Sequence, residues 1–130
     1  MDGSLQETST QASAGVPGLE EVRLLCKLLE EHKGDDVAAL DLRELHSWTD
    51  FFIIATVSSS THREGLLRHI KEFAGSHGLA VLNRTQRKNE ENGGWNLVDM
   101  GTIIIHLMTS QSRNFYELEE LWSSAGTIYP

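Results

Sequence analysis

The sequence predicts an α/β domain of the mixed, α+β kind, with a five-stranded mixed sheet flanked by helices. Apolar residues recur at helical spacing in three segments, and five short apolar runs have the length of strands. One helical segment separates the second run from the third. The predicted order is α-β-β-α-β-β-β-α, and the crossover helix implies a parallel, right-handed connection between the second and third strands.

The first predicted helix covers residues 19–32. Val22, Cys26 and Leu29 recur at positions i, i+4 and i+7, while charged residues occupy the other face. Gly34 follows as a suitable stop. Cys26 is the single cysteine, so it forms no internal disulfide. Its place on the apolar face predicts a buried structural thiol rather than a nucleophile, in a reducing compartment.

The next two apolar runs are strands at residues 37–42 and 51–57. The second run is apolar almost throughout, which predicts burial on both faces. The serines at 58–60 can cap a following helix, and Gly78 can end it. The apolar face of that helix is marked by four residues spaced four, three and four apart: Leu66, Ile70, Phe73 and His77.

A third strand is predicted to start at residues 79–82. We interpret the polar residues 83–94 that follow as a mobile, solvated loop. They belong to the one basic region of the chain, but no aromatic residues are interleaved with the charges, as single-stranded nucleic acid would require. A minor contact with RNA would depend on Arg84, Arg87 and Lys88.

The C-terminal part of the sequence predicts a hairpin and a helix. Residues 95–99 and 102–108 are strands, joined by a tight turn at Met100 and Gly101. Residues 113–124 form the last helix.

Composition fits one domain, residues 19–130, preceded by a disordered tail at residues 1–18. Eleven basic and nineteen acidic residues give a net charge of −8. That charge argues against a protein that mainly coats phosphate backbones; it suits a basic partner, or simply keeps the chain in solution. No apolar run approaches the roughly 20 residues of a membrane span, and the N-terminus lacks the chemistry of a presequence. We therefore expect a cytoplasmic protein without membrane contact.

The last predicted helix carries a candidate binding residue. At about 100° per residue, four side chains form an apolar arc that would face the core: Phe115, Leu118, Trp122 and Ala125. Tyr116 falls on the opposite side, beside Glu120 and with Glu119 at its edge. An exposed tyrosine among carboxylates is typical of a protein-binding hot spot, although single surface aromatics also occur. Trp95, at the start of its strand, either closes the core or stands out as an anchor.

Three blocks of the chain resemble a known family. Residues 49–56 read TDFFIIAT, residues 94–99 read GWNLVD with IIIH following at 103–106, and residues 113–122 read RNFYELEELW. They are similar to the T-D-Y/F-F-V/I-I-A-T, G-W-x-L-x-D…V-H and R-x-F/Y-Y-x-L-E-x-L-W blocks of the ribosomal silencing factors, also called the Iojap-like family. The blocks occur in order, and the likeness extends over about residues 19–124.

The resemblance implies a mixed sheet with helices on both faces, distantly like nucleotidyltransferases but without their chemistry. It implies a bacterial protein with no catalytic site and no cofactor. Such a protein would bind the large ribosomal subunit through its ribosomal protein fourteen, block joining of the small subunit and so repress translation, chiefly when nutrients are short. Self-association as a homodimer is also implied.

The resemblance also implies a set of contact residues: Trp95, Tyr116, Leu118 and Glu119. Glu117 and Glu120 add to the acidic flank that suits a basic ribosomal partner. The resemblance favours Trp95 as an anchor rather than a core residue. The helical arc instead gives Leu118 a supporting role.

Two segments depart from the family pattern. The family's T-G-x-S-x-R-H reads TVSSSTH at residues 56–62, so Val57 and Thr61 replace Gly and Arg. Its G-D turn has Thr102 in place of Asp. A role that depends on the replaced residues is not carried over to this chain.

Two other functions compete with this one. A nucleotidyltransferase needs paired carboxylates soon after a Gly-Ser helix start, whereas Thr, His and Arg follow the serines here; Asp41 and Asp50 are the carboxylates that an enzyme would use. A general ribosome assembly factor is the other alternative. No metal site is predicted, because His62 and His69 lack a third ligand. His106 is expected to be a hydrogen-bonded core histidine that could orient Trp95.

Overall fold

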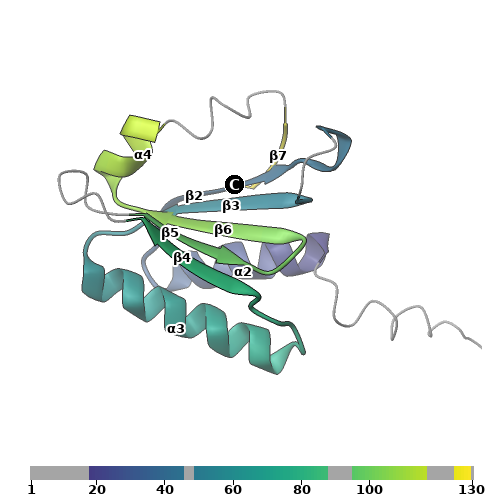
Figure 1. The fold of residues 1–130 in the computed structure, drawn as a ribbon, viewed down its shortest axis with the longest axis horizontal. Helices are drawn as coiled ribbons and strands as arrows, with labels where there is room; N and C mark the ends of the chain where they lie inside the picture. The colour runs from purple at the N-terminus through teal and green to yellow at the C-terminus, as the bar shows by residue number, and fades with distance from the viewer. Residues whose placement is uncertain (1–17, 46–48, 88–94, 117–124, 130) are drawn as a thin grey trace, which may run out of the picture.

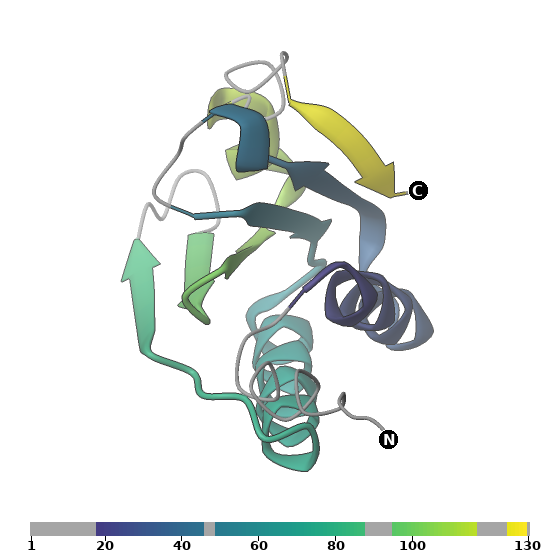
Figure 2. The same cartoon turned by 90° about the vertical axis from the view of Figure 1, so that its right-hand side faces the viewer.

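The structure, a computed structural model, describes residues 18–45, 49–87, 95–116 and 125–129. In chain order its elements are α2 (Leu19–Glu31), β2 (Asp35–Asp41), the short helix η1 (Arg43–Leu45), β3 (Phe51–Thr56), α3 (Ser60–Ser76), β4 (Asn83–Arg87), β5 (Trp95–Asp99), β6 (Ile103–Met108), α4 (Ser110–Tyr116) and β7 (Gly126–Tyr129). α2 and α3 lie against one face of a single sheet, and α4 lies on its other side (Figures 1 and 2). The predicted mixed α/β class is confirmed. The tail predicted at residues 1–18 falls, except for Gly18, outside the described residues.

The sheet has the strand order β4-β5-β6-β3-β2-β7. Among the described strands, β3 and β6 form the one parallel pair, with Thr56 opposite Met108. The prediction that the second and third strands pair in parallel is wrong, because β5 and β6 separate β4 from β3. The reason lies in the side chains. β6 is buried along its whole length and needs neighbours on both sides, whereas the polar sequence of β4 suits a sheet edge.

The third strand begins later than predicted. Leu79 and Val81 pack against the core under α3, but residues 79–82 do not form a strand. Pairing with β5 begins at Asn83, which lies opposite Asp99. The predicted loop is therefore wrong for residues 83–87, which form β4, and its remainder at 88–94 lies outside the described residues.

A sixth strand, β7, completes the sheet beyond the five predicted. It pairs with the outer edge of β2, with Gly126 opposite Asp41 and Tyr129 opposite Ala39. No apolar run marks it, because Gly126 and Thr127 are exposed and Ile128 and Tyr129 are only half-buried. Backbone pairing to an open strand edge forms this strand, and that signal is invisible in hydrophobic periodicity.

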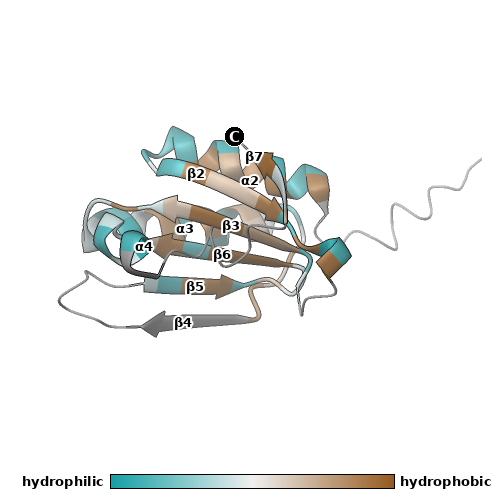
Figure 3. Cartoon of the chain, turned by 90° about the horizontal axis from the view of Figure 1, so that it is seen from above, coloured by the Kyte–Doolittle hydropathy of each residue, from teal (hydrophilic) through white to brown (hydrophobic). Residues whose placement is uncertain are grey.

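Alternating side chains of the central strands build two apolar clusters, one on each face. Ile53 and Ile105 join the larger cluster beneath α2 and α3, which includes Cys26. The second cluster, on the face opposite α2 and α3, consists of Leu40, Leu42, Phe52, Ile54, Trp95, Ile104 and Met108. In Figure 3 the central strands are largely apolar, while α4 is mainly hydrophilic. Burial raises the pKa of the Cys26 thiol to about 12, which agrees with the predicted structural thiol.

The start and end of α3 follow the predicted signals. Ser59 is the N-cap, and its hydroxyl accepts a hydrogen bond of 3.0 Å from the His62 amide. Gly78 adopts a φ of +67° just beyond the helix, a conformation that glycine takes without steric cost. Of the predicted apolar face, Leu66 and Ile70 are buried.

Candidate functional site

Two separate parts of the predicted surface meet at one end of the sheet. Trp95 opens β5 and lies opposite Met108, the last residue of β6. α4 begins two residues after Met108, at Ser110. Trp95 and the start of α4 are therefore neighbours in space, although the chain between them forms a whole hairpin (Figure 1).

The remaining predicted contact residues lie at or beyond the end of α4. Tyr116 is the last residue of the helix, and the structure describes its backbone but not its side chain. Glu117, Leu118, Glu119 and Glu120 lie outside the described residues. Their roles, including the supporting role of Leu118, stay predictions.

Trp95 is a core residue in this structure. Its side chain is only 9% exposed and packs in the apolar cluster on the face opposite α2 and α3. The indole Nε1–H donates a hydrogen bond of 3.1 Å to Nδ1 of His106. The exposed anchor that the resemblance favoured is thus not what the free chain presents.

His106 fixes the position of the Trp95 indole by accepting this hydrogen bond. Since Nδ1 accepts from Trp95, the ring proton of a neutral His106 resides on Nε2. That atom is buried and has no hydrogen-bond partner among the described residues, and the ring meets Phe52 edge-on with centroids 4.7 Å apart. Desolvation lowers the pKa of His106 to about 4, so the ring is neutral at pH 7. The predicted hydrogen-bonded core histidine is confirmed.

The first turns of α4 bury polar residues. The helix begins three residues earlier than predicted, and the hydroxyl of Thr109 accepts a hydrogen bond from the Ser112 amide. Ser112 and Arg113 are buried, whereas Asn114 is exposed. At about 100° per residue, Arg113 lies opposite the apolar arc predicted for this helix. At the start of α4, the buried residues are therefore polar ones and do not lie on the predicted apolar face.

The residues that other functions would use are engaged elsewhere. Asp41 accepts two hydrogen bonds from the Arg43 guanidinium, and these bonds lower the pKa of the carboxyl. His62 accepts from the Ser58 amide at Nδ1, which leaves Nε2 to donate to the His32 carbonyl. Within the described ranges, no three His, Cys, Asp or Glu side chains gather as metal ligands would.

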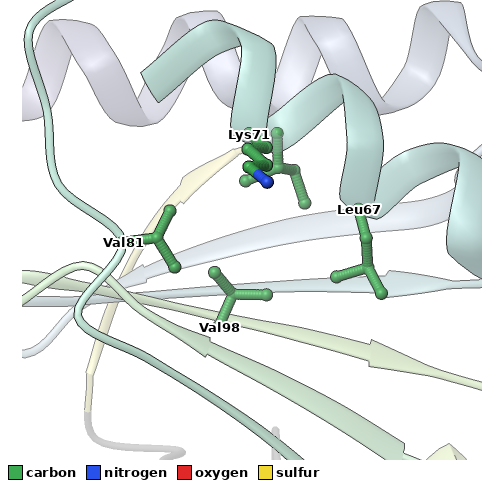
Figure 4. A pocket seen from close by; sticks show the side chains of 5 residues that line it. Leu67, Lys71, Val81 and Val98 are labelled. Atoms are coloured by element: carbon green, nitrogen blue, oxygen red, sulfur yellow. The ribbon is translucent and has the colours of Figure 1, made fainter. Parts of the chain in front are cut away.

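A small pocket lies between α3 and the sheet (Figure 4). Leu67, Ile70 and Lys71 of α3 line it together with Val81 and Val98, around a volume of about 210 Å³. Ligand pockets usually enclose about 300–1,000 Å³ and combine apolar walls with several converging polar groups. Among the lining residues that the structure describes, Lys71 alone is polar.

Across the described part of the chain, none of the helices has the length and apolarity that crossing a membrane requires.

Comparison with known proteins gives one consistent result. Residues 17–129 match the family model described as "Ribosomal silencing factor during starvation". The chain is 35% identical over 98 residues to the ribosomal silencing factor of Treponema pallidum, covering 75% of this chain and 86% of that protein. It is 31% identical over 104 residues to the chloroplastic protein Iojap of Zea mays, covering 80% of this chain but 44% of that protein.

A solved structure agrees with these matches. The crystal structure of a protein from Chromobacterium violaceum superposes with a TM-score of 0.69 and 29% identity, covering 82% of this chain and 88% of that one. The family consists of ribosome-binding factors without enzyme activity, and it implies a partner on the large ribosomal subunit. The chain belongs to the ribosomal silencing factor family, as its three sequence blocks predicted.

Proposed function

We propose that this protein binds the large ribosomal subunit through ribosomal protein fourteen, prevents the small subunit from joining and so represses translation. Family membership is the observation that carries the proposal. The contact residues would be Trp95 and Tyr116, with Leu118 in support and the carboxylates of Glu117, Glu119 and Glu120 facing a basic partner. We place this activity in the bacterial cytoplasm.

The structure supports this assignment through the meeting of two sequence blocks. Trp95 and α4 come together at one sheet end, so residues from both blocks can contribute to one surface. The net charge of −8 favours rapid encounter with a basic protein. Because Trp95 is buried, we assign it a smaller share of direct contact than Tyr116.

Tyr116→Ala tests the surface. We expect the variant to keep its fold and melting temperature, to lose co-sedimentation with purified large subunits, and to allow normal formation of whole ribosomes from subunits. Tyr129→Phe is the matched control, because it alters the chain's other tyrosine on β7, away from the surface. Full co-sedimentation of Tyr116→Ala would refute the proposed surface.

Ribosome assembly is the second candidate function. A mouse protein named "Mitochondrial assembly of ribosomal large subunit protein 1" is 24% identical to this chain over 103 residues, covering 79% of this chain and 45% of that protein. Deleting the gene distinguishes the two functions. Loss of a silencing factor leaves mature large subunits intact, whereas loss of an assembly factor causes incomplete large subunits to accumulate in sucrose gradients.

Two finer proposals accompany the main one. A minor contact between ribosomal RNA and Arg84, Arg87 and Lys88 predicts that binding weakens steeply with added salt. A homodimer that hides the same surface predicts that large subunits convert the dimer to bound monomers. Sedimentation of the free and bound protein measures both effects.

A further inference from the structure

Three polar side chains from three different elements meet where α4 leaves the sheet. The Arg113 guanidinium of α4 donates a hydrogen bond of 2.9 Å to the Thr56 hydroxyl, at the end of β3. It also forms an ion pair of 3.8 Å with the Asp36 carboxylate, near the start of β2. Arg113 is only 6% exposed, although arginine is among the residues least often buried. The Thr56 hydroxyl is thus one of the polar partners that offset its burial, and the Asp36 carboxylate, 78% exposed, adds a longer and weaker contact.

The backbone of β2 is distorted at the position of Asp36. Asp36 has a φ of +51°, in the left-handed region that side chains other than glycine rarely adopt. The pairing register between β2 and β3 also shifts between Asp35 and Ala38, as at a β-bulge. A bulge redirects the side chain of its extra residue. At this bulge, the Asp36 carboxylate reaches the guanidinium of α4.

Arg113 is suited to fix the orientation of a short helix. Its guanidinium is planar and donates in fixed directions, so the bond to Thr56 restricts its position and rotation, and the longer contact with the exposed Asp36 adds a smaller restraint. The Arg113 amide donates to the Thr109 carbonyl, the i→i−4 bond that opens α4, so Arg113 lies in the first turn after β6. Residues three apart are neighbours on a helix, so the placement of Arg113 determines where the backbone presents Tyr116.

We propose that Arg113, held by Thr56 and Asp36, is a positioning residue that sets the orientation of α4 and thereby of the partner-binding surface. This inference rests on the proposed function, because it assigns Arg113 a role in binding that requires no contact with the ribosome. A purely structural arginine would lower overall stability when replaced. A positioning residue changes local order and affinity more than overall stability.

Arg113→Met and Thr56→Val test the inference. Methionine keeps an unbranched apolar side chain but no donors, and valine keeps the shape of threonine without its hydroxyl. We expect each to weaken large-subunit binding about tenfold, as loss of a charge-assisted hydrogen bond would. Amide hydrogens of residues 110–116 should exchange faster, while those of α2 and α3 stay protected. Arg113→Lys should recover part of the affinity.

Arg43→Met is the matched control. It removes another arginine bonded to a carboxylate, Asp41, but at an exposed site away from α4. We expect parental binding and exchange for this variant. If Arg113→Met fails to fold, Thr56→Val still decides, because it leaves the guanidinium in place.

The outcomes separate the inference from the function it rests on. Parental binding by both Arg113→Met and Thr56→Val, beside a Tyr116→Ala variant that does not bind, would overturn the inference and leave the proposed function intact. Unchanged exchange in α4 would overturn it as well. Full binding by Tyr116→Ala would refute the proposed surface, and exchange in α4 would then decide alone whether Arg113 orients the helix.

Discussion

The buried His106 should make the protein lose stability in acid well above the pH at which carboxylates titrate. Its pKa is about 4 in the folded chain and 6.5 when the ring is free in solvent. Above pH 6.5 the ring is neutral in both the folded and the unfolded chain, so burial of the ring does not make the free energy of unfolding depend on pH. Between pH 6.5 and 4 the unfolded chain binds a proton that the folded chain excludes, so stability falls as the pH falls.

The size of the effect follows from the two pKa values. The free energy of unfolding should fall by about 1.4 kcal/mol per pH unit within this window. The fall is about 2 kcal/mol between pH 7.5 and 5.0, and about 3 kcal/mol once the pH is below 4. A domain of this kind is stable by about 5–15 kcal/mol, so urea denaturation followed by circular dichroism measures the change readily.

His106→Leu isolates the contribution of this ring. The variant loses the acceptor for the Trp95 indole and should be less stable at pH 7.5 by roughly 1–3 kcal/mol. Its further loss between pH 7.5 and 5.0 should be smaller than the parental loss by about 2 kcal/mol. His77→Asn, at the exposed end of α3, should retain the whole acid-dependent loss. If His106→Leu loses as much stability in acid as the parent, burial of a neutral His106 is not the cause.

Two further predictions test the core and the helix ends. The Cys26 thiol, with its pKa raised to about 12 by burial, should resist a thiol reagent at pH 8 in the native protein and react at once in urea; rapid native labelling would contradict its burial. Gly34→Ala should destabilise by about 1–3 kcal/mol, because the new Cβ would lie 2.8 Å from the Leu29 carbonyl oxygen. Gly75→Ala, where nothing lies within 4 Å, should stabilise the helix by about 0.5–1 kcal/mol, and equal melting shifts for the two variants would count against the clash.

Strong hydrophobic periodicity predicted the elements whose structure follows from burial of their own apolar side chains. Leu66 and Ile70 mark the buried face of α3, and the apolar runs of β3 and β6 mark the sheet centre. The cap at Ser59 follows from the local affinity of a hydroxyl for free helix amides, so it could also be located from sequence.

The remaining elements depend on partners that are distant in sequence. β4 forms from polar residues because β5 offers a free edge, and β7 forms because β2 does. Pattern alone also left Trp95 undecided between core and surface. Its buried indole N–H needs an acceptor. That acceptor is the ring of His106, eleven residues away across a hairpin. Arg113 is buried against the apolar pattern and donates to Thr56, and no spacing rule relates residues so far apart.

The position of the proposed surface follows from the register of the central strands. Met108 lies opposite Trp95 on one side and opposite Thr56 on the other. Met108 of β6 thus places the Trp95 indole and Thr56, which accepts the hydrogen bond from Arg113, at the same level of the sheet. A slip of one residue in either pair would turn the side chains of a buried strand to the opposite face, so the packing of β6 fixes both registers. The apolar centre of the sheet thereby determines where α4 begins and where its backbone carries Tyr116.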